Sequence, residues 1–176
     1  RKGVDIAIEV AGQLQVRFPD LKLLIVGERN SHKPEAVEYE ARLRRRAAEV
    51  GNVEFLERRD DVSELMRLAS VLLHPARQEP LGRVLLEAAA SGLPIVTTAV
   101  GGSAEILDFP GSERFLLGVD RIDDLSKTVA SLLDDDSLRK QVGQRLRQIA
   151  IERFSIGRCA EQLDQCYREL LKPGGA

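Results

Sequence analysis

Short apolar runs alternate with amphipathic helical patterns along most of the chain, and this alternation constrains the fold more than any other feature. Apolar residues recur at helical spacing over residues 4–14, and the apolar run that follows stops at Gly27. Short apolar runs between helices are typical of buried parallel strands. We therefore expect an α/β fold: a Rossmann-like, doubly wound domain with a mostly parallel sheet of roughly five or six strands and helices on both faces. The expected strands cover residues 23–26, 53–56, 69–73, 93–98 and 114–117.

The connecting segments are expected to be helical. A charged amphipathic pattern covers residues 35–50, and Asp60 or Asp61 is placed to cap a short helix after the second strand. From about residue 123 onward the sequence is helical throughout, which predicts a helical tail. No interior linker interrupts the pattern, so we expect residues 1–176 to form a single domain.

The chain opens on Arg1-Lys2-Gly3, already in a helical pattern and without an initiator Met or a signal peptide. We expect it to be a piece of a longer polypeptide. No apolar run reaches the ~18 residues that a membrane span needs. The expected location is the cytoplasm, with peripheral attachment to the inner membrane through a domain outside this sequence as the alternative.

Composition argues against two classes of binding protein. The net charge is −2, from 26 basic and 28 acidic residues, which argues against a dedicated nucleic-acid-binding protein. Aromatic residues make up only 4% of the chain and Trp is absent, so a stacking platform for bases or sugars is not expected.

Cys159 and Cys166 lie in a helical pattern on the same expected face. At a rise of 1.5 Å per residue they are about 10 Å apart along the helix, too far for a disulfide between them. We expect both to be buried small apolar residues in a reducing compartment.

The segment from His74 to Ala88 is the densest candidate for chemistry, because it leads from the carboxyl end of a central strand through a loop into a helix. Ligands bind beyond the carboxyl ends of the strands in doubly wound sheets. The first N–H groups of a helix have no intrahelical partner, and the helix dipole favours an anion there. Gly82 allows a ligand close to the backbone, and Arg83 adds positive charge.

Two carboxylates flank the start of this helix, and their spacing alone leaves two interpretations open. Glu79 precedes the helix and Glu87 lies inside it, so both could accept hydrogen bonds from hydroxyls of one elongated ligand. Alternatively, Glu79 favours the helix dipole and Glu87 is an ordinary solvated residue.

Ordered motifs across nearly the whole chain resemble those of the C-terminal, donor-binding domain of retaining GT-B glycosyltransferases, of the group 1 type. Glu79 and Glu87 form an E-x7-E pattern within EPLGRVLLEAAASGLPIVTTAVGGSAEIL. The matching pieces also include KG at Lys2-Gly3 and LLIVG, which ends at Gly27. The resemblance implies a Rossmann-like half of a GT-B fold and a nucleoside-diphosphate sugar as donor.

The resemblance also implies roles for individual residues. Glu79 would bind hydroxyls of the donor hexose, Lys2 would neutralise the diphosphate, and these two form the catalytic group. Glu87 would bind the ribose hydroxyls. The remaining implied site residues are Leu81, Gly82, Arg83 and Val84 around the sugar and diphosphate, and Gly101 and Gly102 along the donor cleft; an ordinary strand-to-helix turn is the alternative for that glycine pair.

Several features set limits on this interpretation. The arginine that accompanies the family's lysine is absent from this sequence, and Leu81 replaces the frequent phenylalanine. The acceptor site lies largely on an amino-terminal domain that is absent here, so we expect the isolated chain to bind donor weakly and to be inactive. His74 is expected to be structural, and Arg58 and Arg59 to lie in a solvated loop.

No cofactor or metal is expected. The nucleotide sugar is a substrate, and helix N–H groups with Lys2 would spread the developing charge of the leaving diphosphate. Asp134-Asp135-Asp136 formally contains a D-x-D pattern, but its place between two helices favours a capping role.

Three functions therefore remain in view. The first is the donor-binding domain of a retaining glycosyltransferase that transfers a hexosyl group to the hydroxyl of an acceptor sugar, lipid or small molecule. The second is a nucleotide-sugar epimerase domain, which shares this overall fold. The third is a non-catalytic Rossmann-like binding module.

Overall fold

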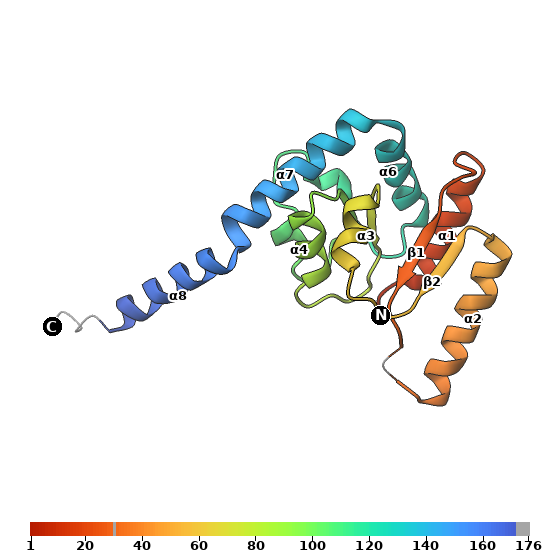
Figure 1. Ribbon diagram of the computed structural model, residues 1–176, viewed down its shortest axis with the longest axis horizontal. Helices are drawn as coiled ribbons and strands as arrows, with labels where there is room; N and C mark the ends of the chain where they lie inside the picture. The colour runs from red at the N-terminus through yellow and green to blue at the C-terminus, as the bar shows by residue number, and fades with distance from the viewer. Residues whose placement is uncertain (30, 172–176) are drawn as a thin grey trace.

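The computed structural model describes residues 1–29 and 31–171 and shows helices packed around short parallel strands (Figure 1). Helices α1 and α2 lie beside β1 and β2, whereas α4, α6 and α7 surround the other strands. The elements in chain order are α1 (Val4–Gln15), β1 (Leu23–Val26), α2 (Pro34–Val50), β2 (Val53–Leu56), α3 (Val62–Leu68), β3 (Leu72–His74), α4 (Arg83–Ala90), β4 (Ile95–Thr98), α5 (Ser103–Ile106), η1 (Ser112–Phe115), β5 (Leu116–Leu117), α6 (Ile122–Asp134), α7 (Asp136–Phe154) and α8 (Ile156–Leu170).

All of the strand pairs are parallel, which confirms the predicted α/β class. Strand β1 pairs with β2, placing Leu23 opposite Val53. Strands β3, β4 and β5 pair in that order, with Leu72 opposite Ile95. The five strands thus form a two-stranded and a three-stranded sheet, rather than the one continuous sheet that we expected.

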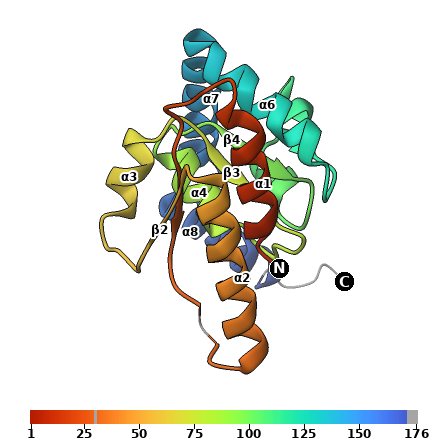
Figure 2. The same cartoon turned by 90° about the vertical axis from the view of Figure 1, so that its right-hand side faces the viewer.

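Helix α1 connects the two sheets by side-chain packing. Its residues Ile6 and Val10 belong to the main core, which lies around the three-stranded sheet. Ile8 belongs to a second cluster with Leu43 and Ala47 of α2, packed against β1 and β2. Because α1 buries residues in both clusters, it joins the sheets without backbone hydrogen bonds between them; Figure 2 shows α1 and α2 side by side.

Strand β4 lies at the centre of the core, and all four of its residues are buried. Leu85 and Ala88 of α4 are fully buried in the same cluster, where α4 packs on α7. The start of α4 is therefore fixed by core packing. By contrast, Leu24 and Val26 of β1 are 41% and 39% exposed, so the expected helical cover on both faces does not extend to this strand among the described residues.

The last predicted strand is shorter than expected. Residues 112–115 form a 3-10 helix, so that only Leu116 and Leu117 pair with β4. The short helix α3 begins after Asp61, as predicted, but the Asp61 side chain does not cap it. Its carboxylate instead accepts two hydrogen bonds of 2.7 Å from Arg59, one of the two arginines expected in a solvated loop.

Helix α8 extends away from the rest of the molecule (Figure 1), and none of its residues is buried. The expectation that Cys159 and Cys166 are buried is therefore wrong: both are exposed. Their spacing correctly places them on one face of α8, but no element within the described residues buries that face. No helix within residues 1–29 and 31–171 has the length and apolar character needed to cross a membrane.

Each carboxylate of Asp134-Asp135-Asp136 has a partner in the structure. Asp135 is the N-cap of α7 and accepts a 2.9 Å hydrogen bond from the backbone N–H of Leu138. Asp134 pairs with Arg17, and Asp136 pairs with Arg139. The predicted capping role is confirmed for Asp135.

Candidate functional site

The Glu79 carboxylate is the centre of the site, although it is only 8% exposed. Its Oε2 lies 2.5 Å from Lys2 Nζ and 3.0 Å from His74 Nε2. Its Oε1 accepts a 3.1 Å hydrogen bond from the backbone N–H of Gly82. The structure thus brings Lys2 and Glu79 together, although they are 77 positions apart in sequence.

Backbone contacts explain how the loop after β3 reaches this position. Gly3 has φ +70°, and a Cβ there would stand 1.9 Å from the carbonyl oxygen of Pro75, so only glycine permits this approach. The carbonyl of Arg1 accepts a 2.9 Å hydrogen bond from the N–H of Arg77. On the other side, Thr97 Oγ1 donates to the carbonyl of His74 at 3.0 Å. The segment that carries Lys2 and the loop that carries Glu79 are therefore held backbone to backbone.

The surroundings of Glu79 favour its ionised form. Burial alone would raise the pKa of Glu79, but the hydrogen bond from Lys2, the N–H of Gly82 and the positive charge of Lys2 outweigh burial and hold it below its usual value. An ionised carboxylate only accepts hydrogen bonds, so His74 Nε2 must carry a proton and donate.

His74 is buried, and burial lowers its pKa. The negative charge of Glu79 opposes this effect, whereas the positive charge of Lys2 adds to it. His74 is therefore neutral at pH 7 and holds the Glu79 carboxylate in place, which extends the structural role that the sequence suggested.

The first turn of α4 leaves backbone donors available. Gly82 adopts the left-handed conformation with φ 81°, and its own N–H is used by Glu79. Within the described part of the chain, no acceptor faces the N–H groups of Arg83 or Val84. These two donors and the helix dipole make an anion-binding position beside Glu79.

Gly101 and Gly102 pack directly on the Glu79 loop. A Cβ at Gly101 would stand 1.8 Å from the carbonyl oxygen of Glu79, and one at Gly102 would stand 2.7 Å from that of Leu81. The glycine pair thus supports the Glu79 loop, because side chains at these positions would push the loop away.

The outer residues of the site are open to solvent. Leu81 is 60% exposed, and the side chains of Arg83 and Glu87 are 82% and 52% exposed. Glu87 lies one turn along α4 from Arg83, and the two charged groups are 3.9 Å apart. No hydrogen bond joins Glu87 to Glu79 among the described residues, so the two carboxylates form separate parts of the site.

Sequence analysis did not identify Arg77 or Asp5 as part of this region. Arg77 lies two residues before Glu79, and its guanidinium binds both oxygens of Asp5 at 2.9 Å. The position of Arg77 within the loop was the available signal, but its partner is 72 positions away and could not be read from spacing.

The fold is that of the C-terminal half of GT-B glycosyltransferases. The chain belongs to the family "Glycosyl transferases group 1", whose model matches residues 1–149. It is 45% identical over 108 residues to the lipopolysaccharide glucosyltransferase WaaG of Escherichia coli, and the aligned region covers 61% of this chain and 27% of that protein. It is 36% identical over 153 residues to a GDP-mannose-dependent mannosyltransferase of Corynebacterium glutamicum, covering 81% of this chain and 38% of that protein.

Solved structures agree with these relationships. A crystal structure of WaaG matches 93% of this chain and 43% of its own, with 33% identity and a TM-score of 0.72. HepE of Anabaena in complex with UDP-glucose matches 96% of this chain and 45% of its own at 24% identity, with a TM-score of 0.80, and therefore shows the shared fold. This chain thus spans less than half the length of each of these relatives.

Proposed function

We propose that this chain binds a nucleoside-diphosphate sugar at the Glu79 loop and the first turn of α4. Together with an acceptor domain outside this sequence, it would transfer the hexosyl group to an acceptor hydroxyl with retention of configuration. The observation that carries the proposal is the buried, ionised Glu79, held by Lys2, His74 and the N–H of Gly82 beside free helix N–H groups.

Positive charge converges where a diphosphate would lie. The Lys2 side chain is 55% exposed, so its ammonium can bind Glu79 and still face a ligand with its remaining protons. The N–H groups of Arg83 and Val84 point from the start of α4, and the Arg83 guanidinium is nearby in sequence and exposed. In the transfer step a bond would form from C1 to the acceptor hydroxyl oxygen, the C1–O bond to the diphosphate would break, and the hydroxyl proton would pass to the leaving diphosphate. The groups around Glu79 would stabilise the negative charge that develops on the leaving oxygen.

Glu79 has capacity left for a sugar hydroxyl. Each carboxylate oxygen has about two lone-pair positions. Oε2 accepts from both Lys2 and His74, whereas Oε1 accepts only from Gly82 among the described residues. The second position of Oε1 would accept a hydroxyl of the donor hexose, and the exposed Glu87 would accept the two ribose hydroxyls.

The open site and α8 both support a further domain. Leu81 and Arg83 are exposed beside the proposed donor position. Helix α8 carries Ile156, Leu163 and Leu170 at 90%, 55% and 80% exposure, spaced so that they share one face. Relatives more than twice as long have room for the domain that would cover these surfaces and bring the acceptor.

Isothermal titration with UDP, GDP and ADP, and with their glucose and mannose derivatives, tests donor binding. We expect one nucleotide series to bind in the micromolar to millimolar range, and the sugar-bearing form to depend on Glu79. Absence of binding to every compound at about 5 mM would contradict the proposal and favour a non-catalytic module.

The alternative function, a nucleotide-sugar epimerase, requires a separate measurement on the longer protein that contains this sequence. A transferase releases nucleoside diphosphate only when an acceptor takes the sugar, whereas an epimerase would convert a nucleotide sugar without an acceptor. We expect the 176-residue chain alone to catalyse neither reaction.

A further inference from the structure

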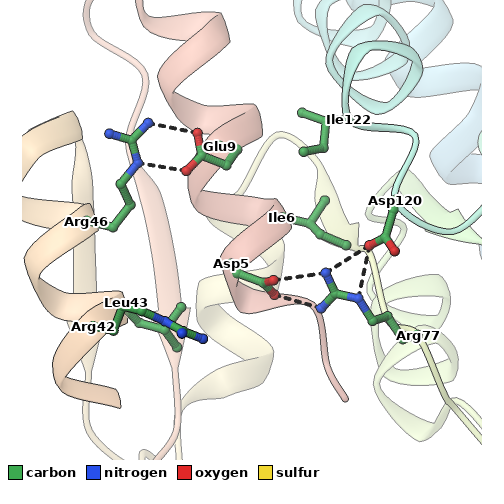
Figure 3. Close-up of a pocket in the computed structure, with 9 residues that line it drawn as sticks. All are labelled: Asp5, Ile6, Glu9, Arg42, Leu43, Arg46, Arg77, Asp120 and Ile122. Carbon is green, nitrogen blue, oxygen red and sulfur yellow. Dashed lines mark hydrogen bonds and ion pairs between the residues drawn. The ribbon is translucent and has the colours of Figure 1, made fainter. Parts of the chain in front are cut away.

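A hollow of about 530 Å³ lies between α1, α2 and the loops that follow β3 and β5 (Figure 3). It does not contain the Glu79 carboxylate, but it adjoins the loop that carries it. Three guanidinium groups line it, and two of them bind an acidic side chain of α1: Arg77 binds Asp5, and Arg46 binds Glu9. The two ion pairs have the same chemistry and differ in what they connect.

Arg77 connects three segments through one guanidinium. It donates to both carboxylate oxygens of Asp5 at 2.9 Å, and its Nε donates to Asp120 Oδ1 at 3.0 Å (Figure 3). Tyr39 of α2 adds a 3.2 Å hydrogen bond to Asp5. We name the cluster of Asp5, Arg77 and Asp120 the Arg77 clamp.

The clamp bridges the two segments that carry the site. Asp5 lies three residues after Lys2, and Arg77 lies two residues before Glu79. The backbone of the same segments is joined where the N–H of Arg77 donates to the carbonyl of Arg1 at 2.9 Å. A shift of Arg77 would therefore change the distance between Lys2 and Glu79.

The third member, Asp120, is held in a conformation that few residues adopt. Its φ of 59° is the single positive value among the non-glycine residues within the described ranges. Aspartate tolerates the left-handed region better than most residues, at some cost. The bond to Arg77 aligns this strained residue with the loop after β3.

The ion pairs of the clamp are partly exposed and contribute little to stability. The hydrogen bonds from Arg77 hold the pKa of Asp5 below its usual value, against the opposing effect of burial. The side chains of Arg77, Asp5 and Asp120 are 36%, 39% and 57% exposed, and ion pairs at such exposure are individually weak. A bidentate guanidinium nevertheless fixes geometry well, so orientation is the larger effect.

We propose that Arg77, clamped by Asp5 and Asp120, is a positioning residue that sets Lys2 against Glu79 for binding of the donor diphosphate. This inference rests on the proposed function. Arg77 itself touches no donor atom and acts through Lys2.

A double-mutant cycle between Arg77→Gln and Lys2→Met tests this role by titration with UDP, GDP and ADP. Misplacement of a binding group by about 1 Å has large effects, so we expect Arg77→Gln alone to weaken binding of the preferred nucleotide about tenfold or more. In the Lys2→Met background, Arg77→Gln should weaken nucleotide binding by less than about twofold, because the ammonium that Arg77 positions is absent. Arg77→Lys should lose less affinity than Arg77→Gln, since lysine keeps the positive charge but not the planar group that binds both oxygens of Asp5.

Arg46→Gln is the matched control, because it removes the other bidentate pair of the hollow and touches neither Lys2 nor the Glu79 loop. It should leave nucleotide affinity unchanged. If Arg77→Gln does not fold, Asp120→Asn weakens the same clamp from its most exposed member. If the wild-type protein binds nucleotide and the clamp variants bind it equally well, the positioning role of the clamp is wrong. The same holds if Arg77→Gln causes an equal loss of affinity with and without Lys2. If the wild-type protein binds no nucleotide, the proposed function itself is wrong.

Discussion

Lys2 Nζ lies 2.5 Å from Glu79 Oε2, which joins the segment before α1 to the loop before α4 across 77 positions of sequence. The lysine is half exposed and the glutamate is buried. A half-exposed cation is thus anchored by a buried anion near the start of a helix, so its exposed side can meet a second anion from solvent.

Lys2→Met is expected to weaken nucleoside-diphosphate binding about 10- to 150-fold, the loss of one charge-assisted hydrogen bond worth about 1.5–3 kcal/mol. Titration of the preferred diphosphate measures it. Lys22→Met removes an exposed lysine far from the loop in sequence and should have no effect. Equal affinities of the two variants would exclude Lys2 from the diphosphate site.

Glu79→Gln is expected to weaken binding of both the plain diphosphate and the sugar-bearing donor about tenfold or more. Glutamine keeps one oxygen for the N–H of Gly82, but its amide N–H₂ group cannot accept from Lys2 or His74, so Lys2 loses its anchor. Glu79→Ala would leave His74 and the N–H of Gly82 without their partner and cost about 1–3 kcal/mol of stability, so it is the poorer test. Titration of both ligands measures the two losses, and an unchanged affinity for the plain diphosphate would show that Lys2 does not depend on Glu79.

Stability is expected to fall as the pH drops below about 6.5. The folded pKa of His74 lies below its unfolded value of 6.5, because burial disfavours the cation and Lys2 adds to the effect, against the pull of Glu79. The unfolded chain therefore binds the extra proton first, which costs up to about 1.4 kcal/mol per pH unit until the folded pKa is passed. Glu79 and Asp5 act lower, as the pH falls through folded pKa values below 4.5 and 3.8.

Urea unfolding between about pH 5 and pH 7.5 measures this dependence. His74→Gln keeps a donor for Glu79 and removes the titrating group, so its stability should change less with pH over that range. An identical pH dependence in both proteins would assign the acid destabilisation to other groups.

The apolar periodicity was sufficient to predict the bounds of β1 and β2 correctly and those of α1 and α2 within one residue. It could not predict the division into two sheets, because strand pairing depends on contacts that are distant in sequence. It also placed Cys159 and Cys166 on one helix face but could not show that this face stays exposed. The family resemblance placed Lys2 and Glu79 in one site, but their direct contact was not predicted, since spacing carries no signal across 77 positions.

Gly101→Ala is expected to destabilise the fold by more than about 3 kcal/mol, because strain from positive φ is added to a backbone clash. Its Cβ would stand 1.8 Å from the carbonyl oxygen of Glu79. Gly111 has φ +86° with nothing within 4 Å, so Gly111→Ala isolates the conformational cost, about 1–2 kcal/mol. Denaturant unfolding compares the two; equal losses would show that Gly101 does not support the loop.

Deletion of residues 156–176 is expected to change the free energy of unfolding by less than about 1 kcal/mol, because α8 buries no side chain. Thermal and urea unfolding of the shortened chain measure the change. A large loss of stability would mean that α8 packs on the body of this domain, and the proposed covering by another domain would no longer be needed.

Titration of nucleoside diphosphate into Glu87→Ala tests the donor site most directly. Loss of the ribose acceptors should weaken binding roughly 30- to 150-fold, about 2–3 kcal/mol, with stability changed by less than about 0.5 kcal/mol. Glu64→Ala is the control, since Glu64 is also an exposed helix residue 3.9 Å from an arginine, Arg67, and it should bind as the wild type does. Wild-type affinity in Glu87→Ala would contradict the ribose assignment and, with it, the donor site at the start of α4.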